Sequence, residues 1–275
     1  MCCSKNGAEH VCDREIIFER LMRFGLKLAP KKALLGVRVI KCTGHRLTAQ
    51  GVKPDPDKVE ALTKLPMPSN ASQLLPVRVA LSYYRKKVPR MATVTRPLNN
   101  LLKKGAKYVL TTEHVEMVQL QVKRLSSPDV LAFPDLDAAV SGDRPFRLIT
   151  DASIDGLGAV IEQKQSDSSI RPLCFRSRTT VPNERNWSAT ELECAAIAWA
   201  KKYRQWFYGT HFIVVSDHQP LKKIESLSTK VNRVRRWYDF LSGYTYTSKY
   251  FGVPAREGQG QYGFDVVFTI ASYGS

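Results

Sequence analysis

The spacing of apolar residues changes along this chain. As far as about residue 140 it is mostly helical, with apolar positions three or four residues apart in segments 17–24, 59–65 and 115–125. A short strand pair is predicted at residues 37–40 and 45–48, between the first two of these helices. Most of the first half is therefore expected to be α-helical.

A further helix is expected after Asn70. Asn70 and Gln73 have the spacing of a capping box, and apolar residues run from there to Tyr83 and Tyr84. Pro76 conflicts with one regular helix, because an interior proline costs about 3 kcal/mol. The helix is therefore expected to restart at Pro76 or to be kinked there.

From Phe146 onwards the pattern is that of an α/β fold. Predicted strands, a long helix and a fully apolar strand follow one another at residues 146–151, 156–162, 172–177, 189–207 and 211–217. A strand–helix–parallel strand unit crosses over right-handed, which places Asp151 and Asp217 at the carboxyl ends of parallel strands. Open α/β sheets bind ligands at such ends.

Three acids lie at positions where a solvent-exposed surface acid is not expected. Asp151 ends the first strand, Asp217 follows the apolar run 212–216, and Glu193 lies on an alanine-rich helical stripe. An unpaired buried carboxylate costs several kcal/mol, so acids placed in this way need a partner. Three converging oxygen donors favour a hard cation such as Mg²⁺ over zinc.

The helix offers a second glutamate, Glu191. Residues 188–191 fit a capping box, in which Glu191 folds back onto the amide that starts the helix. Glu193 lies about 200° further around the helix, on the small-residue stripe. We therefore assign Glu193, and not Glu191, to the acid cluster.

Each acid also has a structural interpretation. Asp151 could cap the turn that follows its strand, and Asp217 could begin a short helix. Glu193 could pair with Lys201 or Arg204. The joint pattern is harder to explain structurally than any single acid, but it does not name a reaction.

The composition is strongly basic. Lys and Arg number 42 against 25 Asp and Glu, a formal charge of +17, which favours a nucleic-acid partner over a merely solubilising surface. No long amphipathic basic helix is present, and the longest apolar run, 194–200, is too short to span a bilayer. Without a signal core or a Cys-x-x-Cys pair, we expect reduced thiols and a cytoplasmic or nuclear protein that is not secreted and has no membrane partner.

Several ordered motifs resemble one family. In the second half these motifs are Thr150-Asp151-Ala152-Ser153, Gly156-Leu157-Gly158-Ala159-Val160, Trp187-Ser188-Ala189-Thr190-Glu191-Leu192-Glu193, Tyr208-Gly209 and Ser216-Asp217-His218-Gln219-Pro220-Leu221. They resemble the ribonuclease H domain of gypsy-type LTR-retrotransposon polyproteins. Motifs at residues 25–28, 44–45, 51–56, 82–85 and 96–98 resemble the segment after the polymerase catalytic strand of the same polyproteins. The resemblance covers roughly residues 10 to 250.

The resemblance implies a ribonuclease H-like α/β fold, with a mixed five-stranded sheet and flanking helices, preceded by a mainly α-helical region. It assigns residues 1–52 to a remnant of the reverse-transcriptase palm end and 53–140 to a thumb- or connection-like helical region. Residues 141–251 would form the ribonuclease H-like domain, and 252–275 a divergent tail.

The resemblance also implies a function, endonucleolytic cleavage of the RNA strand in an RNA–DNA hybrid. Asp151, Glu193 and Asp217 would be catalytic residues and ligands of two Mg²⁺ ions, with Mn²⁺ as a substitute. The residues expected to hold the backbone of the hybrid are Lys222, Lys223, Arg233 and Arg236. The polymerase portion of a reverse transcriptase, supplied in trans, is a second candidate partner.

Two departures from the family bear on activity. No Asp-Asp pair occurs, so DNA synthesis by this chain alone is not expected. The motif that carries the fourth carboxylate of the family is lost after residue 251, and Asp265, the only later Asp, lies in a strand-like run. The alternative is a catalytically impaired, nucleic-acid-binding remnant of a reverse transcriptase. A third possibility, an actin-like phosphate-binding domain, rests on residues 155–158 alone.

Overall fold

The computed structural model describes residue 4 and residues 6–126, 131–199, 203–216, 228–229 and 231–250. The chain divides into two compact units, residues 1–49 and 50–275, which are described separately. Within the described ranges, no helix combines the length and the apolar character that crossing a bilayer requires.

The first unit contains a helix and a hairpin. Its elements are α1 (Gly7–Arg23), the 3₁₀ turn η1 (Pro30–Lys32), β1 (Ile40–Cys42) and β2 (His45–Thr48). Thr43 and Gly44 both have positive φ, which suits the tight two-residue turn between Cys42 and His45. The described pairing begins with Ile40 opposite Leu47, so the first strand starts later than the sequence predicted.

The second unit begins with a strand and a group of helices. These are β3 (Gly51–Pro54), α2 (Pro56–Thr63), α3 (Ala71–Tyr83), α4 (Met91–Val94), α5 (Arg96–Leu101) and α6 (Thr112–Leu125). Leu74, Leu81 and Leu98 are fully buried in the hydrophobic cluster that these helices share. Asn70 caps α3 by accepting a hydrogen bond from the Gln73 amide, and the helix continues through Pro76 without restarting there.

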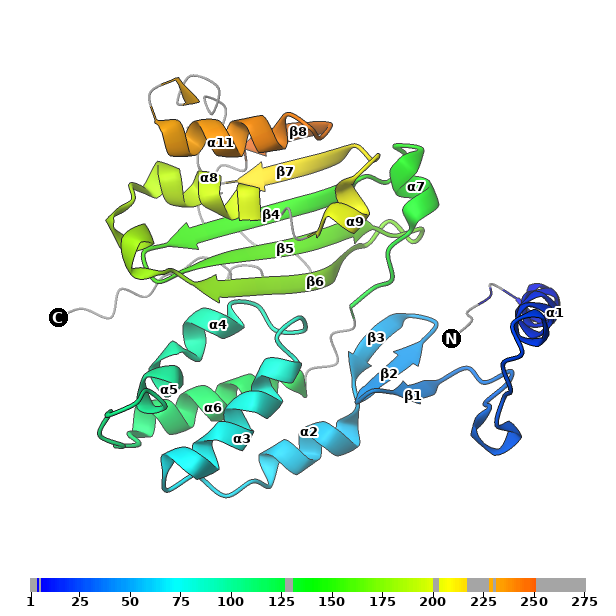
Figure 1. Cartoon of the computed structure of the whole chain (residues 1–275), viewed down its shortest axis with the longest axis horizontal. Helices are drawn as coiled ribbons and strands as arrows, with labels where there is room; N and C mark the ends of the chain where they lie inside the picture. The colour runs from blue at the N-terminus through cyan, green and yellow to red at the C-terminus, as the bar shows by residue number, and fades with distance from the viewer. Residues whose placement is uncertain are drawn as a thin grey trace. The chain divides into compact units, whose positions relative to one another are not determined.

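The rest of the described chain forms a mixed five-stranded sheet with helices (Figure 1). Its elements are α7 (Leu136–Val140), β4 (Phe146–Ser153), β5 (Gly156–Lys164), β6 (Ile170–Thr179), η2 (Pro182–Asn186), α8 (Ala189–Trp199), α9 (Arg204–Phe207), β7 (Phe212–Ser216), α11 (Asn232–Leu241) and β8 (Tyr246–Tyr250). The strand order is β6-β5-β4-β7-β8, with β6, β5 and β4 antiparallel and β4, β7 and β8 parallel. The predicted α/β class and five-stranded sheet are confirmed.

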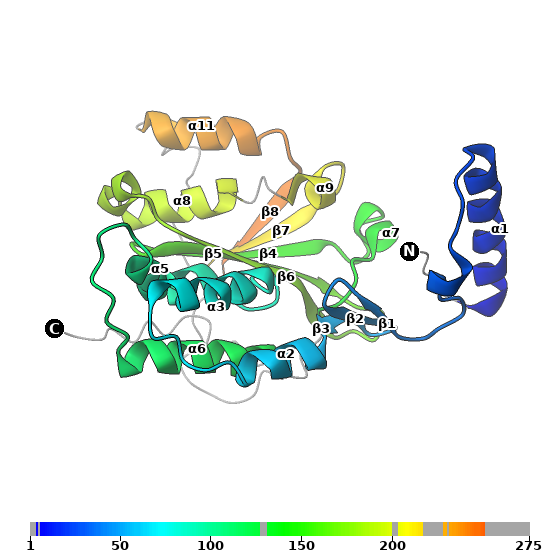
Figure 2. The ribbon, with the colours of Figure 1, turned by 60° about the horizontal axis from the view of Figure 1, so that its bottom comes forward.

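Helix α8 is the central helix of this region. Residues 192–199 are all buried, and α8 packs against β4, β5 and α11. Helices α8 and α11 lie on the same side of the sheet (Figure 2). Phe146, Leu148 and Ile161 of the sheet are fully buried in the core beneath them.

The segment that contains α4 packs on the antiparallel part of the sheet. The Ala92 amide donates a hydrogen bond to Ser177 Oγ (2.9 Å), and the Arg85 guanidinium donates one to the Ser177 carbonyl (3.2 Å). A Cβ on Gly156 would clash with Thr93 Oγ1, so only glycine permits this approach at the turn between β4 and β5. The helical segment is thus held against β6 and the turn between β4 and β5.

Candidate active site

Asp151 lies within β4 and does not end it. The hairpin with β5 continues past Asp151, which faces Gly158, as far as the pair Ser153 and Gly156. The parallel pairing with β7 has its last described pair earlier, at Ile149 and Val215. Asp151 therefore lies just beyond the described parallel pairs, at the edge where β7 ends.

Glu193 reaches the same edge from α8. It is 6% exposed, and its Oε1 accepts a hydrogen bond from the Ala152 amide at 3.0 Å. A bond from an N–H to a carboxylate is stronger than one between neutral groups, so it fixes the orientation of Glu193. The carboxylate of Glu193 thus lies beside the β4 backbone immediately after Asp151.

An arginine that sequence reasoning missed contacts Asp151. Arg90 Nη2 is 3.5 Å from Asp151 Oδ2, and both side chains are mostly buried. Arg90 precedes α4 and has φ +53°, a left-handed conformation that is uncommon outside glycine and asparagine. No local sequence signal pairs the two residues, because their contact depends on the packing of α4 against the sheet.

The third predicted ligand, Asp217, lies outside the described residues and follows β7 directly in sequence. Lys222, Lys223 and Asp265 also lie outside them. Among the residues that the structure describes, no group of three or more His, Cys, Asp or Glu is arranged to hold a metal. Asp151 and Glu193 both lie near the end of β4, and hard oxygen donors of this kind fit Mg²⁺ or Mn²⁺.

The two thiols of this region are buried and inert. Burial raises the pKa of Cys174 to about 11, and burial followed by the charge of Glu193 raises the pKa of Cys194 to about 12. A thiol must ionise to act as a nucleophile, so neither serves as one at neutral pH. Both match the sequence-based interpretation as small buried residues.

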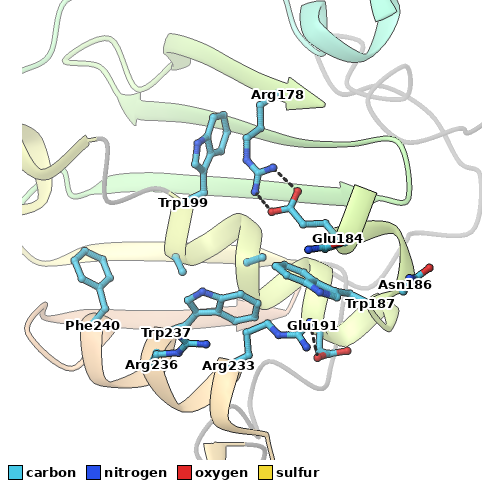
Figure 3. A pocket seen from close by; sticks show the side chains of 13 residues that line it. Arg178, Glu184, Asn186, Trp187, Glu191, Trp199, Arg233, Arg236, Trp237 and Phe240 are labelled. Atoms are coloured by element: carbon cyan, nitrogen blue, oxygen red, sulfur yellow. Dashed lines mark hydrogen bonds and ion pairs between the residues drawn. The ribbon is translucent and has the colours of Figure 1, made fainter. Parts of the chain in front are cut away.

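A pocket lies on the side of α8 that carries Glu191, away from Glu193. It has a volume of about 890 Å³ and is lined from β6, η2, α8 and α11 by aromatic and charged side chains (Figure 3). Arg178 donates two hydrogen bonds to the Glu184 carboxylate, at 2.5 and 2.7 Å. Burial would raise the pKa of Glu184, but the hydrogen bonds from Arg178 and from the Val181 amide outweigh it and lower the pKa.

Arg233, predicted to hold nucleic acid, lines this pocket. Its guanidinium is 4.5 Å from the centre of the Trp187 ring and 3.4 Å from Glu191 Oε1. Glu191 also accepts hydrogen bonds from the amide and hydroxyl of Ser188, so the predicted capping box is confirmed. Arg236 lines the same pocket and is exposed. The two predicted nucleic-acid arginines that the structure describes therefore lie together on α11.

The sheet order, the acid-bearing edge and the central α8 define the class of this region. Residues 141–244 match the family described as the RNase H-like domain found in reverse transcriptase. This part of the chain is an RNase H-like domain of that family, as its motifs predicted.

The chain as a whole is homologous to segments of retrotransposon Pol polyproteins. It is 33% identical over 251 residues to the retrovirus-related Pol polyprotein from transposon 297 of Drosophila melanogaster, covering 90% of this chain and 22% of that protein. It is 28% identical over 268 residues to the Pol polyprotein from transposon gypsy of the same organism, covering 92% of this chain and 25% of that protein. The chain thus spans a quarter or less of these two relatives.

A solved structure shares the fold. The foamy viral protease-reverse transcriptase in complex with RNA/DNA hybrid aligns with a TM-score of 0.72 at 18% identity, covering 94% of this chain and 36% of that chain. At this identity the similarity establishes the fold and no more.

Proposed function

We propose that this chain is a ribonuclease H-type endonuclease that cleaves the RNA strand of an RNA–DNA hybrid. An RNase H-like domain supports a nuclease kind of enzyme. The observation that carries the proposal is the hydrogen bond from the Ala152 amide to Glu193, which brings a buried carboxylate of α8 beside Asp151 of β4.

In this proposal Asp151, Glu193 and Asp217 hold Mg²⁺, or Mn²⁺ in its place. When bound, the ions would activate water and neutralise charge on the leaving 3′ oxygen. The chain itself supplies orientation, because the Ala152 N–H fixes Glu193 and the β4–β5 hairpin fixes Asp151. No side-chain nucleophile is needed, which agrees with the inert thiols.

The proposed substrate is consistent with the charge of the chain. A formal charge of +17 favours a polyanion, and the foamy viral neighbour was solved with an RNA/DNA hybrid. Lys222, Lys223, Arg233 and Arg236 would hold its backbone, and duplex shape and sugar hydroxyls would be recognised more than base sequence. The polymerase portion of a reverse transcriptase would be a partner in trans, in the cytoplasm or the nucleus.

A gel assay on hybrid with a labelled RNA strand tests the proposal. The wild-type chain should cleave the RNA when Mg²⁺ or Mn²⁺ is supplied, and Asp151→Asn should reduce the rate by about 100-fold or more. Asp155→Asn is the matched control, because Asp155 lies on the same hairpin and pairs with Arg96 instead. Equal cleavage by wild type and Asp151→Asn, or none by wild type with either ion, would remove the proposal.

The Arg90–Asp151 ion pair favours a second candidate, a catalytically impaired nucleic-acid-binding remnant. An arginine against Asp151 neutralises the acid that the leading proposal assigns to metal. Hybrid binding that persists in a chelator, together with undetectable turnover by the wild-type chain, would support this second function over the first.

A further inference from the structure

Arg90 lies in a segment that is bonded to the sheet region both before and after Arg90 in the sequence. Before it, Arg85 bonds the Ser177 carbonyl; after it, the Ala92 amide bonds Ser177 Oγ and Arg96 pairs with Asp155. These anchors join the segment to β6 and to the β4–β5 turn. The approach of Arg90 to Asp151 is therefore built into the packing, unlike that of a long side chain lying over an open surface.

The charge of a second guanidinium, that of Arg124, interacts with the charge of Arg90. The pKa of Arg124 on α6 is lowered by burial and, in addition, by the positive charge of Arg90, so the two charges lie close enough to repel one another. Repulsion between them raises the electrostatic gain when Arg90 meets an anion. Asp151 Oδ2, at 3.5 Å, is such an anion.

We propose that Arg90 is a resident counter-ion of Asp151, a positioning residue that a divalent cation has to displace. This inference rests on the proposed function, because it assumes that Asp151 is a metal ligand. Guanidinium and metal ion both seek the same carboxylate, and their positive charges repel one another. Arg90 thus holds the acid in place before the ion arrives, and lowers the affinity of the site for the ion.

The choice of variant separates charge from structure. Arg90→Asn removes the guanidinium, and asparagine adopts the left-handed conformation of this position more readily than arginine. The affinity for Mn²⁺ should rise about fivefold, the equivalent of about 1 kcal/mol for a partly buried ion pair. Arg90→Lys, which keeps the charge, should remain close to wild type. Damage to the fold would lower the affinity, so the direction of the change is diagnostic.

The measurement is a titration of the full chain with Mn²⁺ at fixed ionic strength, with free Mn²⁺ read by electron paramagnetic resonance. Arg96→Gln is the matched control, since it removes one positive charge from the same segment at the pair with Asp155. It should leave the affinity unchanged, and Asp151→Asn should abolish the tight site.

The outcomes separate this inference from the function on which it rests. If Arg90→Asn binds Mn²⁺ no more tightly than wild type or Arg96→Gln, while Asp151→Asn loses the site, Arg90 is not the counter-ion and the metal site stands. If the wild-type chain binds no Mn²⁺, or Asp151→Asn binds it equally well, the proposed metal site is rejected and this inference with it.

Discussion

The two glutamates of α8, on opposite sides of the helix, differ in burial and in their contacts. Glu193 faces the sheet, is almost fully buried, and accepts a hydrogen bond from the backbone of β4. Glu191, two residues earlier, closes the start of the helix and lies 3.4 Å from Arg233 on α11. Helix α8 thus carries one acid, Glu191, that caps the start of the helix and another, Glu193, that reaches the edge of the sheet.

The two sites also differ in where the arginine that pairs with each acid comes from. On the pocket side, Glu184 and Glu191 have arginine partners in the same domain, Arg178 and Arg233, among packed tryptophans. At the sheet edge, Asp151 meets an arginine from a separate helical segment. Acids paired with arginines of the RNase H-like domain itself suit a structural role. Asp151 is paired with Arg90 of the helical segment that precedes this domain, and it can exchange that contact for a metal ion.

The largest expected effect distinguishes the two glutamates directly. Glu193→Gln keeps the shape and an acceptor for the Ala152 amide but removes the charge, so hybrid cleavage should fall by about 100-fold or more. Glu191→Gln should change cleavage by less than about threefold and cost about 1 kcal/mol of stability through the weakened cap. Steady-state rates and urea unfolding measure both, and comparable rate losses would contradict the assignment.

The pocket side should respond in stability and not in rate. Trp237 is half-buried against Trp187, with ring centres 5.3 Å apart. Trp237→Ala should lower the free energy of unfolding by about 2–3 kcal/mol, with Trp237→Phe losing less than half of that. Urea denaturation measures the loss, and cleavage is compared per folded molecule. A rate loss without a stability loss would place the pocket in the active site.

The features that local sequence predicts well are those whose cause is local. The capping box at Glu191 follows from four consecutive residues, and the burial of Glu193 follows from the small residues around it on the same helix. The predicted strands correspond to β4, β5, β6 and β7, whereas β8 (Tyr246–Tyr250) is not an apolar run and was not among them. The predicted end of the first of these strands at Asp151 was wrong, because the extension of β4 to Ser153 depends on its pairing with β5.

The features that local sequence could not predict depend on packing between distant segments. Arg90 was one basic residue among many, and only the contact of α4 with the sheet brings it to Asp151. The pocket likewise gathers Arg178 from β6 and Arg233 from α11 around one helix. Sequence reasoning assigned Arg233 to nucleic acid as part of a basic, aromatic region of the resembled domain, and missed its contacts with Glu191 and Trp187.

A smaller effect concerns the pH dependence of the Arg178–Glu184 pair. Because the folded-state pKa of Glu184 lies below its ordinary value of 4.5, its stabilisation is present above that pH and is lost as the pH falls through the folded-state pKa. Glu184→Gln should therefore cost about 1–2 kcal/mol at pH 7 and progressively less below pH 4.5. Urea unfolding across this range measures the change.

Glu162 provides a control of opposite sign. Burial raises its pKa, and the nearby Arg147 only partly offsets this. Its contribution to stability is therefore greatest below pH 4.5 and is lost as the pH rises through the folded-state pKa. Glu162→Gln should become relatively more favourable with increasing pH. If both variants shift in the same direction, the pocket pair is not the cause of the acid dependence.

The smallest effect tests whether the pocket side contacts the substrate at all. Arg235 and Arg236 are adjacent, exposed and equally charged, but only Arg236 lines the pocket. If the hybrid backbone passes there, Arg236→Ala should weaken binding about three- to fivefold and reduce the salt slope by about one, because one phosphate contact is lost. Arg235→Ala should change both less. Equal losses would mean that α11 contributes only its overall charge, and the pocket would then remain a structural feature of the side of α8 opposite Glu193.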